Sequence, residues 1–224
     1  MIPLRDDNPT RTRPIVTYAL IGACLLTFLW QLALGPGNAE AAIYALGFIP
    51  AVFFGVDTLP AELDWLPAPL TIVTSMFLHG GILHLAGNLL YLWIFGDNIE
   101  DRMGRGRFFA FYVVCGFAAA LAQALPDMGS RVPMIGASGA ISGVLGAYIL
   151  LYPHARVLVA VPVFVVLYTV RLPALFVLGL WFLGQLASSA IVGSAGAGVA
   201  FRAHIGGFVA GLAFVHLFAR RSRD

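Results

Sequence analysis

The chain has 224 residues, of which 60% are hydrophobic and 11% are charged, and its mean hydropathy is +0.89. This composition excludes a soluble globular domain, which needs more polar surface to face water. The formal net charge is only +2, so nothing in the composition indicates a nucleic-acid partner. Both cysteines, Cys24 and Cys115, lie inside apolar runs, which argues against a disulfide framework and against a cysteine-based metal site. We therefore predict a single membrane domain.

The apolar runs predict an all-α, polytopic membrane protein with six transmembrane helices. The first run contains about 20 residues, enough to cross a hydrocarbon core about 30 Å thick. Residues 35–70 follow as a long loop, and their aromatic side chains place this loop at the membrane interface. The predicted helices cover residues 14–34, 84–96 (or 79–96), 108–125, 138–152, 173–192 and 203–219, and residues 97–107 form a charged loop.

The segment 156–171 does not have the pattern of a membrane helix. It is apolar, but it contains Pro162 and valines in near alternation, which favours extended backbone. We predict that this segment lies along the cytoplasmic interface. A loop rich in Gly, Ala and Ser then precedes the last helix.

The placement of arginine predicts the orientation in the membrane. Six crossings put both termini on one side, and that side then carries all but two of the 13 basic residues. They are Arg5, Arg11, Arg13, Arg102, Arg105, Arg107, Arg156, Arg171, Arg220, Arg221 and Arg223, against Arg131 and Arg202 on the other side. By the positive-inside rule, residues 1–13 and the tail 220–224 are cytoplasmic, and residues 14–219 form the membrane domain. A seventh crossing by 156–171 would move the C-terminal arginines outside, so we reject it.

The fourth predicted helix is short and begins at Ser138, between Gly136 and Gly139. It ends before Pro153, because proline cannot continue a helix. At 1.5 Å per residue its length is about 21 Å, less than the thickness of the membrane core, so Ser138 lies below the outer surface. His204 lies at a similar distance from the end of the sixth helix, and we expect the two side chains at one depth.

Glycine spacing predicts that these two helices approach closely. The fourth helix has Gly139 and Gly143 four residues apart, and the sixth has Gly207 and Gly211. The serine hydroxyl would then reach an imidazole nitrogen of the histidine, as a serine activated by a general base requires. No acidic residue falls within the later spans, so the sequence predicts a Ser–His dyad without a carboxylate.

Two further polar side chains lie on one face of the second helix, where His84 and Asn88 are four residues apart. The unpaired amide groups at the start of the Ser138 helix suit an oxyanion. The two side chains would add hydrogen-bond donors to the same oxygen.

Three motifs, in this order, resemble those of the rhomboid intramembrane serine proteases, and the whole is most similar to the six-span bacterial form. They are His79-x4-His84-x3-Asn88, Gly136-Ala-Ser138-Gly139 and Ala203-His204-x2-Gly207-x3-Gly211, and the resemblance covers about residues 14–219. It implies an endopeptidase that cuts transmembrane segments of other membrane proteins near the outer surface, without metal or cofactor. The expected location is a bacterial inner membrane.

The resemblance also implies roles for single residues. Ser138 would be the nucleophile and His204 the general base, with an oxyanion hole formed by the Ser138 amide, His84 and Asn88. His79, Gly136, Gly139, Gly207 and Gly211 would support the site, and substrate would enter between the second and fifth helices. Two features depart from the family. The first loop has no Trp-Arg pair, and Ser142 stands where some members have an aromatic residue.

Other classes of protein remain open at this point. A small transporter should show repeated halves or broken helices around a midplane site. A catalytically inactive rhomboid-like binder should have lost the serine or the histidine, and this chain retains both. His79 and His84 as metal ligands would lack the Glu of the zinc-protease motif His-Glu-x-x-His. The sequence indicates neither the substrate nor the oligomeric state.

Overall fold

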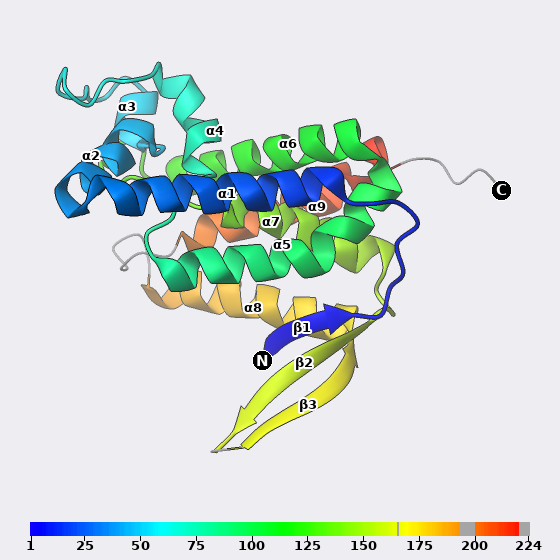
Figure 1. The fold of residues 1–224 in the computed structure, drawn as a ribbon. Coiled ribbons are helices and arrows are strands. Elements are labelled where there is room, and N and C mark those ends of the chain that lie inside the picture. Colours follow the sequence, from blue (N-terminus) through cyan, green and yellow to red (C-terminus); the bar gives the residue numbers. More distant parts are fainter. Residues whose placement is uncertain (165, 193–199, 220–224) are drawn as a thin grey trace.

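Six long helices lie side by side in the computed structural model, which describes residues 1–164, 166–192 and 200–219 (Figure 1). They are α1 (Ile15–Leu34), α5 (Ile82–Met103), α6 (Arg105–Ala124), α7 (Ser138–Leu151), α8 (Ala174–Val192) and α9 (Phe201–Phe218). Each begins within a few residues of a predicted helix. The predicted tail 220–224, and most of the loop predicted before the last helix, lie outside the described residues.

The short helix α7 occupies the centre of the bundle. Every residue from Gly139 to Tyr148 is buried, and α7 packs against α5, α6, α8 and α9. Among the described helices, α1, α6, α8 and α9 are long and apolar enough to cross a membrane, and α7 is apolar but shorter. The central helix is therefore the one that the sequence predicts to be too short to span, and its N-terminus lies within the bundle.

Glycines allow α7 and α9 to pack with their backbones in contact. A Cβ atom added to Gly207 would collide with the carbonyl oxygen of Gly139, and one added to Gly211 would collide with the carbonyl oxygen of Gly143. The small-residue faces predicted from the spacing therefore do meet, and no larger residue fits at either position of α9 without moving the helices apart.

The prediction of a loop over residues 97–107 is wrong. Helix α5 continues to Met103 and α6 starts at Arg105, so that only Gly104, with φ of 79°, separates them. The charged residues remain helical because they contact the start of α1. Glu100 is 1% exposed and accepts hydrogen bonds from the amides of Val16 and Thr17 (3.0 and 2.7 Å) and from the Thr17 hydroxyl (2.8 Å). An acidic side chain thus satisfies amide groups that the first turn of α1 leaves free.

Replacing Glu100 by alanine is expected to lower the free energy of unfolding by about 2–3 kcal/mol, because it leaves buried amide groups without acceptors. Glu100→Gln keeps one acceptor oxygen and should cost less. The change is measured by SDS titration in mixed micelles, followed by circular dichroism. An alanine variant as stable as the unsubstituted protein would contradict this account of α1.

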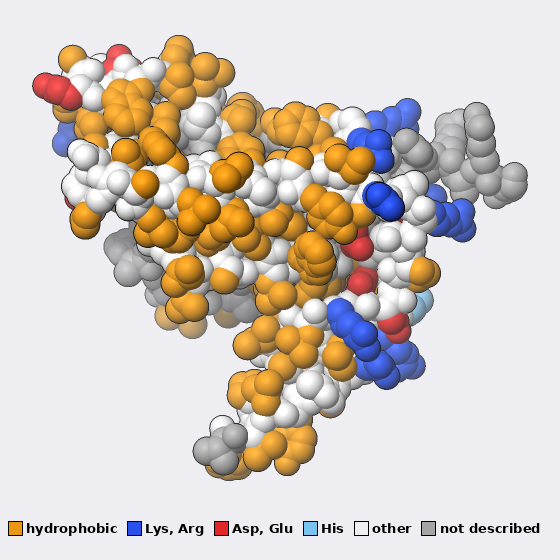
Figure 2. All heavy atoms as spheres, viewed as in Figure 1, with side chains coloured by type: hydrophobic (Ala, Val, Ile, Leu, Met, Phe, Trp, Pro, Cys, Tyr) orange, Lys and Arg blue, Asp and Glu red, His pale blue; other side chains and the backbone are white. Residues whose placement is uncertain are grey.

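The all-α fold class is also wrong in part, because the chain contains a three-stranded antiparallel sheet. Strands β2 (Arg156–Val163) and β3 (Val166–Pro173) form a hairpin, and β1 (Ile2–Asp6) pairs with β2, Ile2 opposite Ala160. Residues 156–171 are therefore extended, as their valine pattern predicts. Figure 1 shows the hairpin projecting from the bundle, and hydrophobic side chains cover much of its visible surface (Figure 2).

The first strand is tied to the central helix. The Tyr148 hydroxyl donates a hydrogen bond to the Asp6 carboxylate (2.5 Å), and the Arg156 amide donates one to Asp7 (2.7 Å). Burial raises the pKa of the Asp6 carboxyl above its ordinary value, against the opposing effect of this hydrogen bond. The polar N-terminal residues are thus part of the folded structure.

Residues 35–70, predicted as a loop, contain short helices: α2 (Pro36–Leu46), α3 (Pro50–Phe53) and the 3-10 helix η1 (Ala68–Leu70), followed by α4 (Thr71–Ser75). Proline stands in the first turn of α2, α3 and η1, where its missing N–H costs nothing. This region folds over the end of the bundle at which α7 begins (Figure 1), and its contacts there bear on the site described next.

Candidate active site

Ser138 is the first residue of α7, and the approach to it depends on Gly136. Gly136 has φ of +113°, a conformation that side chains rarely adopt, and its amide donates to the carbonyl oxygen of Ser75 (2.8 Å). A Cβ atom at this position would lie 2.6 Å from Nε2 of His84. Glycine is therefore required both by the backbone and by the imidazole that packs over it.

The structure brings Ser138 and His204 into hydrogen-bonding distance. Ser138 Oγ lies 2.8 Å from His204 Nε2, although the residues are 66 positions apart and come from different helices. The close packing of α7 on α9 makes this distance possible, since His204 lies one turn before Gly207. The equal depth expected from the helix lengths agrees with this contact.

The other ring nitrogen of His204 also has a partner. Its Nδ1 lies 2.7 Å from Oε1 of Gln185 on α8. Gln185 is not among the site residues that the sequence analysis identified. The signal that could have found it is a polar side chain in the middle of an otherwise apolar helix, which is costly in a membrane and is by default a functional candidate.

Aromatic rings from two helices border the same imidazole. The ring centroid of Trp181 lies 6.0 Å from that of His204 at an interplanar angle of 35°, and Phe201 is edge-on at 6.5 Å. Trp181 and Phe201 therefore supply the aromatic surroundings of His204. One turn after the serine stands Ser142, whose hydroxyl donates to the carbonyl oxygen of Ser138 (2.6 Å).

His84 and Asn88 lie beside the turn that leads to Ser138. His84 Nδ1 accepts a hydrogen bond from the Gly80 amide (3.3 Å), and its Nε2 is directed at Gly136. Asn88 is buried, its Nδ2 lies near Gly136, and this amide nitrogen has no hydrogen-bond partner among the described residues. A buried donor without an acceptor is unfavourable, and a ligand oxygen at this place would satisfy it.

His79 precedes α5, so the second helix does not begin at this residue, and the rings of His79 and His84 meet edge to face at 5.1 Å. Gln31 of α1 fixes its backbone: the His79 amide donates to Gln31 Oε1 (3.0 Å), and Gln31 Nε2 donates to the His79 carbonyl (3.3 Å). Within the described part of the chain, no three His, Cys, Asp or Glu side chains group as metal ligands would.

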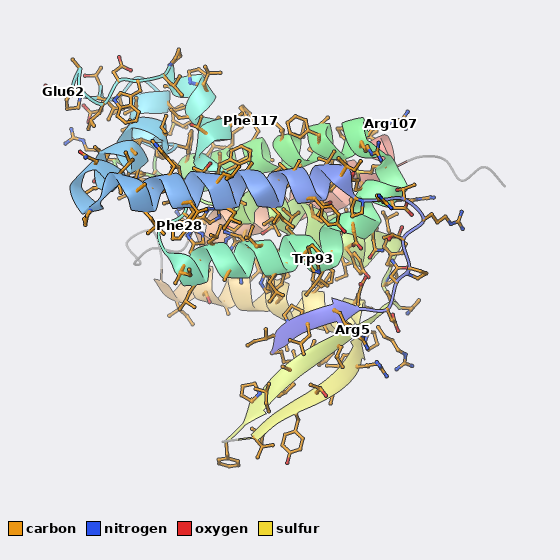
Figure 3. The ribbon with its side chains drawn as sticks, viewed as in Figure 1. Arg5, Phe28, Glu62, Trp93, Arg107 and Phe117 are labelled. Atoms are coloured by element: carbon orange, nitrogen blue, oxygen red, sulfur yellow. The ribbon has the colours of Figure 1, made fainter. Side chains whose placement is uncertain are left out.

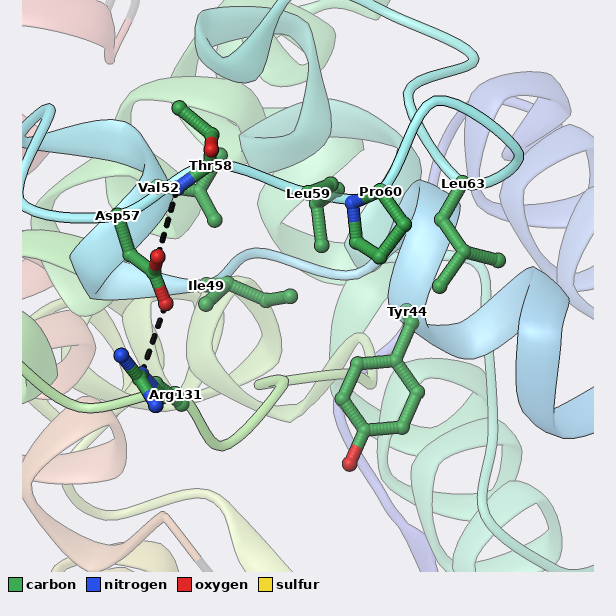
Figure 4. A pocket seen from close by; sticks show the side chains of 9 residues that line it. All are labelled: Tyr44, Ile49, Val52, Asp57, Thr58, Leu59, Pro60, Leu63 and Arg131. Carbon is green, nitrogen blue, oxygen red and sulfur yellow. Dashed lines mark hydrogen bonds and ion pairs between the residues drawn. The ribbon is translucent and has the colours of Figure 1, made fainter.

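Two cavities lie near this end of the bundle. One adjoins Ser138, Gly136 and Ala203 and has a volume of about 10 Å³, roughly the room for one water molecule. The other, of about 280 Å³, lies between residues 44–63 and Arg131 and does not reach Ser138 (Figure 4).

The second cavity contains an ion pair that links the first loop to the segment preceding Ser138. Arg131 Nε lies 2.7 Å from Asp57 Oδ2. Phe48 and Met134 also form a β-bridge, with amide–carbonyl distances of 3.1 and 2.8 Å. These contacts anchor the first loop, which lacks the family's Trp-Arg pair, directly to the backbone that positions the serine.

Comparisons with known proteins agree in one family. The rhomboid domain family matches residues 68–221, more than half of the chain. Rhomboid protein 1, mitochondrial, of Saccharomyces cerevisiae is 33% identical over 134 residues, covering 53% of this chain and 39% of the yeast protein. Rhomboid protease GluP of Bacillus subtilis is 36% identical over 138 residues, 60% of this chain and 24% of GluP. The chain thus spans well under half the length of either relative. With α5 to α9 all inside the matched region, this chain belongs to the rhomboid family of integral membrane proteins.

Proposed function

We propose that this protein is an intramembrane serine endopeptidase that hydrolyses peptide bonds in or near transmembrane segments of other membrane proteins. The observation that carries the proposal is the 2.8 Å contact between Ser138 Oγ and His204 Nε2 at the half-buried start of α7. A serine and an imidazole in contact inside an apolar bundle are costly, and acyl transfer is the chemistry that uses this pair. The name of the similar Bacillus subtilis protein, a rhomboid protease, supports this class of activity.

His204 acts as the general base. Its bare Nε2 accepts the proton of the Ser138 hydroxyl while Oγ forms a bond to the scissile carbonyl carbon, and the carbonyl π electrons move to the oxygen. When the tetrahedral intermediate collapses, the protonated imidazole gives this proton to the leaving amine. A water molecule then repeats the sequence on the acyl-enzyme and releases the acid product.

An oxyanion hole stabilises the negative oxygen of the intermediate. We assign it the Ser138 amide, the Asn88 Nδ2 group and the Nε2 group of His84. The first turn of α7 supplies amide groups without intrahelical acceptors, and Asn88 supplies a buried donor without a partner among the described residues. His84 suits the role as a donor because its Nδ1 accepts from Gly80, which leaves the proton on Nε2.

Substrate enters laterally between α5 and α8. These helices have few backbone contacts with each other, and the rings of Tyr91 and Trp181, 6.3 Å apart, face each other across the boundary. Many large apolar side chains of α8 are exposed, as expected of a helix that faces lipid or an incoming transmembrane segment. Movement of this helix would open a path to Ser138 without unpacking α7 from α9.

The arginine-rich end of the bundle faces the cytoplasm. Figure 3 places Arg107 and Arg5 towards the end where α1 begins, and Glu62 at the other end, where the first loop covers the start of α7. This distribution supports six crossings with residues 1–13 on the cytoplasmic side, by the positive-inside rule. Ser138 then lies nearer the extracytoplasmic face. We assign the protein to a bacterial inner membrane, as its resemblance to the six-span bacterial form implies.

The hairpin of β2 and β3 lies at the cytoplasmic membrane interface in this arrangement. Phe164 at its turn is fully exposed, and β3 is an edge strand, whose unpaired backbone groups need access to water. A spin label on Phe164→Cys in proteoliposomes is therefore expected to collide more with oxygen, which is enriched in lipid, than with a water-soluble nickel complex. A label on Arg156→Cys is expected to collide more with the nickel complex than with oxygen. The native cysteines are buried and stay unlabelled. Equal exposure of both labels to the nickel complex would contradict this placement.

The function is tested with a single-span reporter protein reconstituted beside this protein in proteoliposomes. The wild type should cut the reporter in or near its transmembrane segment, and Ser138→Ala should leave it whole. A wild type that binds the reporter without cutting it would favour the inactive rhomboid-like binder instead. A small transporter would neither bind nor cut it.

A further inference from the structure

Gln185 stands out because it is a polar side chain on a helix whose neighbours are apolar. Helix α8 reads Leu-Trp-Phe-Leu-Gly-Gln-Leu-Ala around it, and the Gln185 amide is only partly buried between α8 and α9. Its Oε1 lies 2.7 Å from Nδ1 of His204. No second hydrogen-bond partner of this nitrogen occurs among the described residues.

The chemistry of the two atoms decides which tautomer this contact favours. An amide oxygen only accepts hydrogen bonds, so a bond to Nδ1 requires the proton to be on Nδ1. A neutral imidazole has one proton, and Nε2, 2.8 Å from Ser138 Oγ, is then bare. This is the tautomer in which the ring accepts the serine proton. The opposite tautomer would place two acceptors, the unprotonated Nδ1 and the amide oxygen, against each other and leave the serine without a base.

We propose that Gln185 is a positioning residue, which holds His204 in the tautomer with Nδ1 protonated and Nε2 free to accept the proton of Ser138. The inference rests on the proposed function and changes the Ser–His dyad into a neutral Ser–His–Gln array. A carboxylate is not needed at this place, because an uncharged acceptor orients the ring without burying a negative charge in the membrane. Trp181, whose ring borders the imidazole at 6.0 Å, limits its rotation.

The contact also couples the base to the position of α8. This helix packs on α9 through Phe182, whose ring stacks on Phe208 at a centroid distance of 4.3 Å, while many of its other large side chains are exposed. Outward movement of α8, on the side where substrate enters, would withdraw Gln185 from His204. His204 is therefore fully oriented only when α8 is packed on α9. A site from which α8 has moved outward, without substrate, is less reactive.

The test separates orientation from folding. Gln185→Leu, which cannot accept a hydrogen bond, is expected to lower kcat for reporter cleavage about 10- to 100-fold with little change in KM, because the population with a bare Nε2 falls. Gln185→Glu restores an acceptor oxygen and should recover kcat to within about threefold of the wild type. Nitrogen-15 NMR of labelled histidine reports the tautomer directly, with the His204 signals identified by their loss in His204→Ala.

The matched control is Gln123→Leu on α6. This residue also bonds to α9, since its Oε1 accepts from the Ala203 amide (3.2 Å), but it does not contact the imidazole. The expected spectra show Nδ1–H in the wild type and in Gln123→Leu, and a shift towards Nε2–H in Gln185→Leu. A wild-type His204 protonated on Nε2, or an unchanged tautomer and kcat in Gln185→Leu, would overturn the inference. Loss of cleavage by the wild type itself would instead refute the proposed function.

Discussion

Replacing His204 by alanine is expected to lower kcat for cleavage of a transmembrane reporter by about 10,000-fold or more, while binding of the reporter is little affected. Without the imidazole, Ser138 keeps its hydroxyl proton and remains a weak nucleophile, and the leaving amine has no proton donor. The measurement is single-turnover cleavage in proteoliposomes at saturating enzyme, so that the rate reports the chemical step and not substrate entry.

The matched control for this variant is His216→Ala on the same helix. His216 is exposed in the last turn of α9, far along the helix from Ser138, and the same substitution there should leave the cleavage rate unchanged. A His204→Ala variant that folds and cleaves within about tenfold of the wild type would contradict the assignment of the general base.

Replacing Asn88 by alanine is expected to lower kcat about 100- to 1,000-fold, which is the usual cost of losing one oxyanion donor. In the structure this side chain is buried beside Gly136, and its Nδ2 has no acceptor within the described residues. The loss should fall on kcat and not on KM, because the donor gains its partner only when the carbonyl oxygen becomes negative. Steady-state kinetics on the same reporter separates the two constants.

Stability distinguishes this effect from simple damage to the fold. Since Asn88 makes no protein hydrogen bond through Nδ2 in the described structure, Asn88→Ala should unfold at the same SDS fraction as the wild type, or at a higher one. The comparison is Asn98→Ala, on the same helix as Asn88. Asn98 Nδ2 does have a partner, because it donates to the carbonyl oxygen of Asn8 (3.0 Å). This variant should lose stability and retain kcat. The opposite pattern would remove Asn88 from the oxyanion hole.

The parts of this fold that depend on local sequence could be predicted. Hydrophobic length located the six long helices, and Pro153 marked the end of α7 to within two residues. The glycines four residues apart on α7 and α9 indicated which two helices touch, and from this followed the contact between Ser138 and His204. These signals are periodic or steric, so each is readable without knowledge of the rest of the chain.

The parts that depend on distant partners could not be predicted. Strand β1 pairs with β2 across more than 150 positions, and nothing in residues 2–6 alone favours a strand over a polar tail. Glu100 reads as part of an exposed charged loop until its partners, the first amides of α1, are known. In each case a favourable contact far along the chain decides the local conformation.

Gln185 illustrates the same limit within the site. Its place in an apolar helix marks it as unusual, but the sequence does not say which face of α8 meets α9, and so cannot tell lipid contact from contact with His204. His204 lies 19 positions after Gln185 and on another helix, so no local motif joins the two residues. The packing of Phe182 and Trp181 on Phe208 contributes to the rotation of α8 that directs the amide inward.

The most direct test of the account is the site of reaction with a fluorophosphonate, which phosphonylates a serine made nucleophilic by its surroundings, with loss of fluoride. With the protein in a bilayer, mass spectrometry of the labelled chain should find one adduct, on Ser138, and its rate of formation should fall at least about 1,000-fold in His204→Ala. Labelling that persists in Ser138→Ala, or a rate that does not depend on His204, would contradict the claim that this pair of side chains carries the chemistry.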